Sequence, residues 1–197
     1  MKTGPHSRVA LVTGGATVVF RELVDETLMP KFLTALQDHG FSTLLLQCGV
    51  YHDQVLAKLA SREPDNLTIE VFDFDPDLKG RMRICRGEAN LQPAGVVISH
   101  AGTGTIADCA EVQVAQIIVA NPNLMDNHQH EFAQSMARDH ASLVHGRLGS
   151  LHEAIPEALA VIKSLGLDSL EPYQEPVFPL RDEDRLTLID QVIAHGV

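Results

Sequence analysis

Residues 96–108, Val-Val-Ile-Ser-His-Ala-Gly-Thr-Gly-Thr-Ile-Ala-Asp, are the most informative stretch of this chain. The apolar run 96–98 predicts the end of a buried strand, the residues rich in Gly and Thr predict a turn, and a helical pattern follows from residue 103. The first backbone N–H groups of a helix have no partner within it and lie at the positive end of its dipole. This turn is therefore a natural cradle for an anion.

A second polar block, Asp-Asn-His-Gln at 126–129, comes one strand later, after the apolar run Ile-Ile-Val at 117–119. In a chain of alternating strands and helices, consecutive strand-to-helix turns open on the same edge of the sheet, where ligands bind. We therefore expect the two blocks to face one pocket.

The same alternation runs through most of the chain. Short apolar runs predict strands at 8–13, 43–47, 67–72, 95–99, 116–120 and 141–145. Helical spacing predicts helices at 20–38 (kinked or divided at Pro30), 52–62, 78–85, 103–112 and 126–139, and from a capping box at 150–153 to about Gly166. The pattern predicts an α/β fold with a largely parallel sheet.

The character of the sequence changes at residue 168, so we expect a lobe over 1–167 and an appendage over 168–197. Prolines punctuate an acidic, poorly periodic stretch at 168–181, which predicts an extended connector. A final amphipathic helix follows, with its apolar stripe formed by Leu186, Ile189, Val192 and Ile193. The stripe could pack on its own domain or dock onto a partner subunit, and the sequence leaves both open.

Composition excludes several classes of function. The chain has 197 residues, 45% of them hydrophobic, and a formal net charge of −11, so it can form one good core but repels nucleic acid and anionic membranes. Three scattered cysteines, Cys48, Cys85 and Cys109, indicate buried, inert thiols in a reducing compartment. With no visible signal peptide and no apolar stretch near the roughly 20 residues of a membrane span, we expect a soluble, cytosolic protein.

Each of these polar motifs could have a structural role instead of binding a ligand. Gly14 and Gly15 after the first strand could approach a phosphate or could form an ordinary tight turn, and they match neither the dinucleotide fingerprint nor a P-loop. Asp108 could accept hydrogen bonds from a ribose or could complete a capping box with Thr105. His100 could donate to a phosphate or could cap its turn.

The second block carries the same ambiguity, because Asp126 and Gln129 could form a capping box. His128 and His130 do not indicate a metal site, since residues at i and i+2 of a helix point about 200° apart. We expect neither a metal nor a cofactor.

Taken together, SHAGTGTIAD and LMDNHQ closely resemble the UDP-N-acetylglucosamine transferase subunits of asparagine-linked glycosylation, the thirteenth member of the ALG series. The resemblance includes the VTGGAT start, the phrase FDFDPDL and the VISH strand, and covers roughly residues 8–160. The chain is more distantly similar to the carboxyl-terminal half of the bacterial transferase MurG. The resemblance implies a Rossmann-like parallel sheet with flanking helices, equivalent to the donor-binding lobe of a GT-B glycosyltransferase.

The resemblance also implies roles for individual residues. Gly102, Thr103, Gly104 and Thr105 match the turn that contacts the donor phosphates, and Gly14 and Gly15 match the glycine turn at the cleft. Asp108 stands where MurG-like enzymes have a ribose-binding glutamate. His128 and Gln129 stand where they have paired glutamines near the sugar hydroxyls, so we expect Asp126, Asn127, His128 and Gln129, together with His100, beside the donor.

The family implies a two-chain enzyme, an N-acetylglucosaminyldiphosphodolichol N-acetylglucosaminyltransferase. A membrane-anchored partner, the fourteenth member of the series, supplies the acceptor lobe and holds this chain on the cytosolic face of the endoplasmic reticulum. Together they transfer GlcNAc from UDP-GlcNAc to GlcNAc-diphosphodolichol. No residue of this chain is assigned as the catalytic base, and the alternative is a non-catalytic nucleotide-sugar-binding protein.

Overall fold

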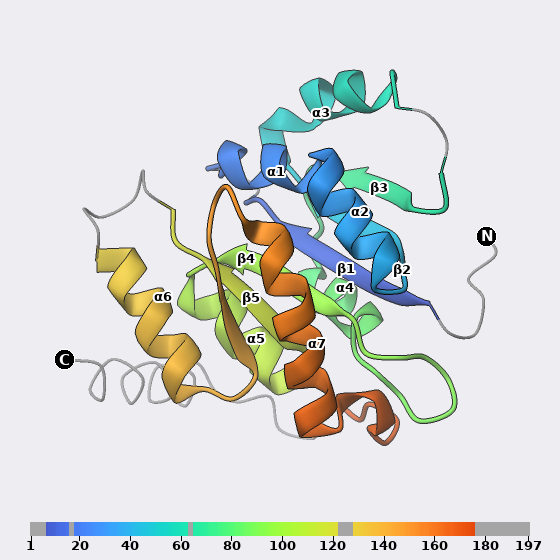
Figure 1. The fold of residues 1–197 in the computed structure, drawn as a ribbon, viewed down its shortest axis with the longest axis vertical. Helices are drawn as coiled ribbons and strands as arrows, with labels where there is room; N and C mark the ends of the chain where they lie inside the picture. The colour runs from blue at the N-terminus through green and yellow to red at the C-terminus, as the bar shows by residue number, and fades with distance from the viewer. Residues whose placement is uncertain (1–6, 16–17, 63–64, 122–127, 176–197) are drawn as a thin grey trace.

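The computed structural model describes residues 7–15, 18–62, 65–121 and 128–175, the side chains of 128–132 excepted, and contains one parallel sheet flanked by helices (Figure 1). The strands are β1 (Arg8–Thr13), β2 (Phe41–Gln47), β3 (Thr68–Phe72), β4 (Val96–His100), β5 (Ala115–Val119) and β6 (Leu143–Gly146). The helices are α1 (Arg21–Thr27), α2 (Pro30–Asp38), α3 (His52–Leu59), α4 (Leu78–Ile84), α5 (Thr103–Val112), α6 (His128–Asp139) and α7 (Ala154–Leu165). None of the described helices is long and apolar enough to span a bilayer.

The sheet order is β3-β2-β1-β4-β5-β6, and every neighbouring pair is parallel. Because side chains alternate along a strand, each central strand serves two cores. On one face Val12 and Ile98 pack with residues of α1, α2, α3 and α7. On the other face Leu11 and Val97 pack with residues of α4 and α5, and α6 covers Ile118 beside α5. The predicted α/β fold is thus confirmed.

The helix predicted over 20–38 is divided in two. Pro30 is the first residue of α2, a position where the missing proline N–H costs no hydrogen bond. At the other end of the chain, Gly166 ends α7 with φ of 66°, as the sequence predicts.

The capping box predicted at residues 150–153 is wrong. A 3₁₀ turn, Leu151–Glu153, precedes α7, and the side chain of Ser150 makes no capping hydrogen bond. The buried carboxylate of Glu26, at the end of α1, accepts hydrogen bonds from the N–H groups of Gly149 (2.7 Å) and Leu151 (2.8 Å). The backbone N–H groups of this turn are therefore satisfied by a side chain that lies 125 positions before Leu151 in the sequence.

Residues 167–175 run back along the body of the domain. Leu167 is buried, and the Asp168 carboxylate accepts a hydrogen bond from Arg8 at 2.7 Å and one from the Ala94 N–H at 2.8 Å. The arm, which we define as residues 170–175, then crosses α4: the Tyr173 ring lies beside Arg83 and Arg86, and Glu175 pairs with Arg83 at 2.7 Å.

Candidate functional site

The order of the strands places the topological switch point of the sheet between β1 and β4. From β1 the chain builds outward through β2 to β3, then crosses to β4 and builds outward in the other direction. At such a switch point the two strand-to-helix turns diverge, and ligands of α/β proteins bind in the gap. Gly14 and Gly15 follow β1, and the turn that leads from His100 into α5 follows β4.

The turn after β4 presents unpaired backbone donors. Helix α5 begins at Thr103 with Gly102 as its N-cap, and its first hydrogen bond runs from the Ile106 N–H to the Gly102 carbonyl at 3.2 Å. The N–H groups of Thr103, Gly104 and Thr105 precede that bond and have no partner within the helix. Gly104 is exposed, and a Cβ built on it would meet no atom within 4 Å. A ligand can therefore approach this backbone closely, and the geometry suits an anion.

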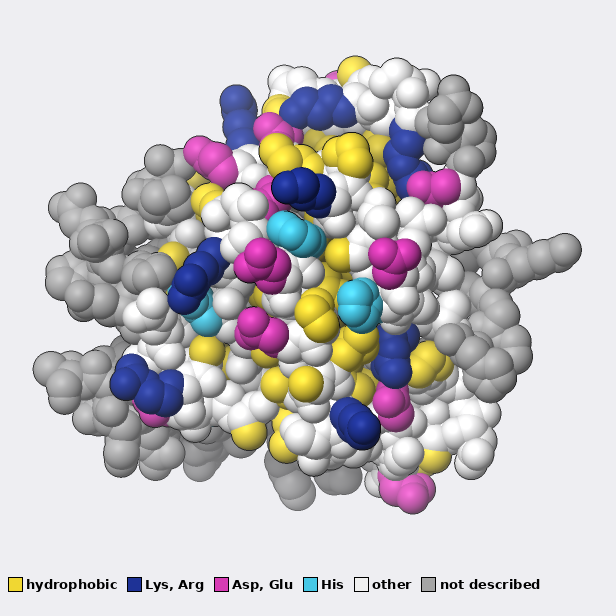
Figure 2. Space-filling view, in the orientation of Figure 1, with side chains coloured by type: hydrophobic (Ala, Val, Ile, Leu, Met, Phe, Trp, Pro, Cys, Tyr) yellow, Lys and Arg dark blue, Asp and Glu magenta, His cyan; other side chains and the backbone are white. Residues whose placement is uncertain are grey.

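Basic side chains do not gather into a patch on the face drawn in Figure 2. There Lys and Arg side chains lie singly among acidic, histidine and hydrophobic ones. In a chain with a net charge of −11, local backbone donors must hold an anionic ligand against the overall field.

The glycine turn after β1 is shaped by close packing. The Gly14 N–H donates to the Gln47 carbonyl at 2.9 Å, and a Cβ on Gly14 would lie 2.5 Å from Val24 and 2.6 Å from that same carbonyl oxygen. Gly15 has φ of 91°, in the left-handed region that favours glycine. The N–H of Gly14 is therefore engaged in the fold, which supports the structural interpretation of this residue, and a phosphate contact at Gly15 remains a prediction.

His100 is half-buried at the end of β4, and its ring makes no hydrogen bond among the described residues. Burial lowers the pKa of His100 below its usual value of 6.5. The imidazole is therefore neutral near pH 7 and can offer a phosphate one N–H but no charge. Behind it, Gln116 donates to the Ser99 hydroxyl, which donates to the His100 carbonyl, both at 2.8 Å.

Of the two roles left open for Asp108, the capping box with Thr105 is wrong, because α5 begins two residues before Thr105. Asp108 lies in the second turn, where its carboxylate is 3.4 Å from the Lys79 ammonium of α4. Lys79 also pairs with Glu111 at 2.8 Å. Asp108 is therefore engaged with α4 in the ligand-free chain, and its predicted ribose contact remains a prediction.

The second polar block is described only in part. His128 and Gln129 are the first residues of α6, which follows β5 at the same edge of the sheet as α5, but their side chains lie outside the described residues. Asp126 and Asn127 lie outside them altogether, as do the tail residues Leu186, Ile189, Val192 and Ile193.

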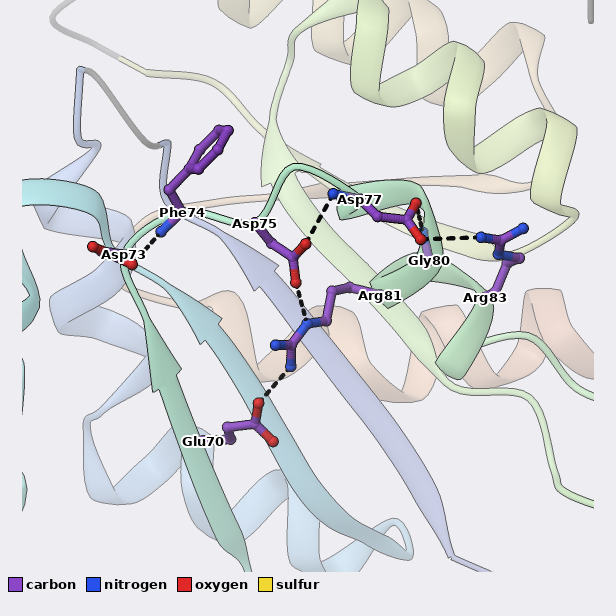
Figure 3. A network of polar contacts seen from close by, with 8 residues as sticks. All are labelled: Glu70, Asp73, Phe74, Asp75, Asp77, Gly80, Arg81 and Arg83. Carbon is purple, nitrogen blue, oxygen red and sulfur yellow. Dashed lines mark hydrogen bonds and ion pairs between the residues drawn. The ribbon is translucent and has the colours of Figure 1, made fainter.

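The loop after β3 contains two Asp-x-Asp pairs, a pattern that can hold a metal ion, but its carboxylates are used within the protein (Figure 3). Asp75 accepts hydrogen bonds from Arg81 (2.7 Å) and from the N–H of Asp77 (2.8 Å), and these two interactions, led by Arg81, lower the pKa of Asp75. Asp77 caps α4 by accepting from the Gly80 N–H at 2.8 Å. The described residues hold no cluster of three or more His, Cys, Asp or Glu side chains able to bind a metal.

Phe74 in this loop is a further candidate residue, one that the sequence pattern did not indicate. Its ring is 64% exposed and points away from the polar network drawn in Figure 3. It follows β3 on the same edge of the sheet as the turns after β1 and β4. An aromatic side chain so exposed at a ligand-binding edge is the signal that could have identified it, but exposure is not visible in sequence.

The three cysteines are free and buried, as predicted. Burial, with a smaller contribution from Asp73, raises the pKa of Cys48 to about 11, and burial also raises the pKa values of Cys85 and Cys109. These thiols are therefore protonated at neutral pH and unsuited to nucleophilic chemistry.

Comparisons with known proteins agree on one family. Residues 9–165 match the glycosyltransferase family 28 C-terminal domain. The UDP-N-acetylglucosamine transferase subunit ALG13 of Yarrowia lipolytica is 34% identical over 143 residues, covering 73% of this chain and 67% of that protein.

Solved structures share the fold. An NMR structure of ALG13 superposes with a TM-score of 0.59 at 24% identity, covering 92% of this chain and 95% of that one. Acinetobacter baumannii MurG superposes with a TM-score of 0.59 at 20% identity, covering 98% of this chain but 51% of MurG. The chain thus spans about half of that transferase.

Proposed function

The chain belongs to the glycosyltransferase family 28 C-terminal domain family and to the ALG13 group of UDP-N-acetylglucosamine transferase subunits, and on this premise we propose that it is the donor-binding half of a two-chain glycosyltransferase. The pair transfers GlcNAc from UDP-GlcNAc to GlcNAc-diphosphodolichol, an early step in building the lipid-linked oligosaccharide for N-glycosylation. The observation that carries the proposal is the exposed first turn of α5, with its unpaired N–H groups beside the β1 turn.

The donor diphosphate binds at this turn. Thr103, Gly104 and Thr105 offer three N–H groups to it, and a hydrogen bond to a charged group contributes about 1.5–3 kcal/mol. Because the donors are fixed in the helix before the ligand arrives, little ordering is lost on binding. Asp108 accepts from the ribose hydroxyls by exchanging Lys79 for the ligand, and the exposed ring of Phe74 stacks on the uracil base.

The sugar lies toward the start of α6, where Asp126, Asn127, His128 and Gln129 supply polar groups for its hydroxyls. This placement rests on the chain order and on the position of α6 beside α5 at one edge of the sheet. Amide and imidazole groups suit the neutral hydroxyls of GlcNAc, because they can both donate and accept.

The acceptor lobe comes from a second, membrane-anchored subunit. Two observations support this arrangement: the relative is named a subunit, and the chain matches only 51% of the MurG chain. We assign the tail residues Leu186, Ile189, Val192 and Ile193 to the contact with that subunit, which holds this chain on the cytosolic face of the endoplasmic reticulum.

The chemistry divides between the two subunits. The acceptor hydroxyl attacks the anomeric carbon of GlcNAc while the bond to the β-phosphate breaks, and UDP departs with the electron pair. The first turn of α5 stabilises the charge that grows on the departing diphosphate. We assign the base that takes the hydroxyl proton to the partner lobe, so this chain by itself binds donor without transferring sugar.

A reconstituted transfer assay tests the proposal. The purified chain is mixed with UDP-GlcNAc and a phytanyl diphosphate-GlcNAc acceptor, with and without membranes that contain the partner subunit. Transfer only in the presence of the partner supports the proposal. Donor binding with no transfer under either condition would favour the non-catalytic nucleotide-sugar-binding alternative.

A further inference from the structure

Arg86, one residue past the C-cap of α4, is a buried cation with no anion beside it in the described part of the chain. Its side chain is 5% exposed, and no carboxylate among the described residues lies within 4 Å of it. Nη1 reaches the Gly87 carbonyl at 3.3 Å, Nη2 reaches the side-chain oxygen of Gln113 at 3.5 Å, and Nε has no partner. Both distances are long compared with the roughly 2.7–2.9 Å of a charge-assisted hydrogen bond.

Other arginines in the same structure have the kind of carboxylate partner that Arg86 lacks among the described residues. Arg8, Arg81 and Arg83 each contact a carboxylate at 2.7 Å, and all are more exposed than Arg86. Acidic residues are plentiful, since the chain has 26 of them against 15 Lys and Arg. A buried guanidinium without a counter-charge is strongly unfavourable, and the Tyr173 ring, 5.7 Å away, offsets only part of that.

A cleft opens beside this charge. It has a volume of about 530 Å³, and its walls are Arg86, the end of α5 at Glu111 and Gln113, and the arm at 170–174. The Glu111 carboxylate pairs with the Lys79 ammonium at 2.8 Å. Glu111 therefore does not serve as the counter-charge of Arg86, although it lies in the wall of the same cleft. The cleft lies at the opposite end of α5 from the first-turn donors, so it is separate from the proposed donor site.

We propose that this cleft binds a small oxyanion, a phosphate or carboxylate group, at the guanidinium of Arg86. Nε and Nη2 form one edge of the guanidinium: among the described residues Nη2 has one long hydrogen bond, and Nε, which is enclosed by the protein, has none. Two parallel N–H···O bonds along such an edge are the geometry in which arginine recognises carboxylates and phosphates. The ligand lies against the Tyr173 ring and so contacts the arm.

Selective labelling gives a direct test, because the chain has two tyrosines, Tyr51 and Tyr173. The full chain, labelled with ¹⁵N-tyrosine, is titrated with sodium phosphate and separately with sodium acetate, at constant ionic strength set with NaCl. We expect a saturable shift of the Tyr173 amide in the millimolar range, with the Tyr51 amide unmoved. The more effective anion identifies the preferred group. No saturable shift with either anion, or equal shifts of both amides, would overturn the proposal.

Two variants assign the effect to Arg86. Arg86→Gln should weaken binding at least tenfold, whereas Arg21→Gln, which removes the guanidinium beside the Tyr51 ring, should leave it unchanged. Gln113→Glu places a carboxylate within reach of Nη2, so it should raise the melting temperature and also weaken binding at least tenfold. If Arg86→Gln fails to fold, Gln113→Glu by itself tests the proposal. An unchanged melting temperature together with unchanged anion binding in that variant would contradict an unsatisfied charge at Arg86.

Discussion

The imidazole of His100 lies against Gly102, so closely that a Cβ on Gly102 would come within 2.6 Å of Nε2. The Gly102 N–H also donates to the His100 carbonyl at 2.7 Å. The last residue of β4 and the N-cap of α5 thus fix the same tight turn from two sides. The exposed first turn of α5 depends on this contact, because any side chain at residue 102 would push the ring or the turn aside.

The lowered pKa of His100 has a consequence for stability. In the unfolded chain the imidazole takes up a proton near pH 6.5, whereas in the folded chain it does so only at lower pH. The unfolded state therefore binds more protons as the pH falls below 6.5, and stability declines there, while above 6.5 both states are neutral. We expect wild-type protein to lose more melting temperature between pH 7.5 and 5.5 than His100→Gln does, with His152→Gln as the control for losing one histidine. A His100 NMR titration midpoint above 6.5 would contradict this.

Gly104→Val should abolish donor binding without unfolding the protein. The space around this position is open, so the branched side chain fits the folded state but covers the N–H groups that the diphosphate needs. Ala110→Val, on an exposed position of the same helix, is the matched control. We expect both variants to melt within a few degrees of wild type, because surface substitutions usually change stability by about 0.5 kcal/mol. Donor affinity should fall at least a hundredfold in the first variant only; equal affinities would remove this turn from the site.

Asp108→Asn separates ribose binding from ion pairing. If Asp108 accepts from the ribose, the donor KM should rise about tenfold or more, since a hydrogen bond to a charged group contributes about 1.5–3 kcal/mol. Glu111→Gln disturbs the same lysine but not the ribose, and should change stability by about 1 kcal/mol or less with KM unchanged. Similar kinetic effects in the two variants would show that Asp108 acts only through Lys79.

The role of the C-terminal apolar stripe in partner binding is tested by a point substitution in the chain of 197 residues. Ile189→Gln should abolish co-sedimentation with membranes that contain the partner and leave thermal melting unchanged, because a fully buried isoleucine contributes about 1.5–3 kcal/mol to a contact. Asp190→Asn, on the adjacent polar position, should change neither. A lower melting temperature with binding retained would instead assign the apolar stripe to the chain's own domain.

Much of the fold could be predicted because local signals agreed with the tertiary structure. The strand at Arg8–Thr13 matches its predicted bounds, and Pro30 and Gly166 mark the predicted helix ends. One failure is a position where a distant residue satisfies the backbone. Glu26 replaces the predicted cap at Ser150, and nothing in the local sequence reveals that contact.

For the candidate site, the course of the backbone could be predicted from the sequence, but the contacts of its side chains could not. The run from His100 to Thr105 predicts a strand, a tight turn and a helix start, and the structure has all three. The partners of the side chains were not predictable, because Lys79 lies 29 residues from Asp108 in sequence and meets it only when α4 packs on α5. Exposure of Phe74 likewise depends on the completed sheet edge.

We place the donor at the switch point of the sheet, between the ends of β1 and β4. An amide-resolved NMR titration of the full chain with UDP-GlcNAc tests it most directly, with uridine as the ligand that lacks the diphosphate. We expect UDP-GlcNAc, and not uridine, to move the amide signals of Thr103, Gly104 and Thr105, and Gly104→Val to remove the effect. Saturable shifts confined to another hollow, such as the groove between α2 and α3 lined by Leu33 and Arg62, with the α5 turn unmoved, would contradict it.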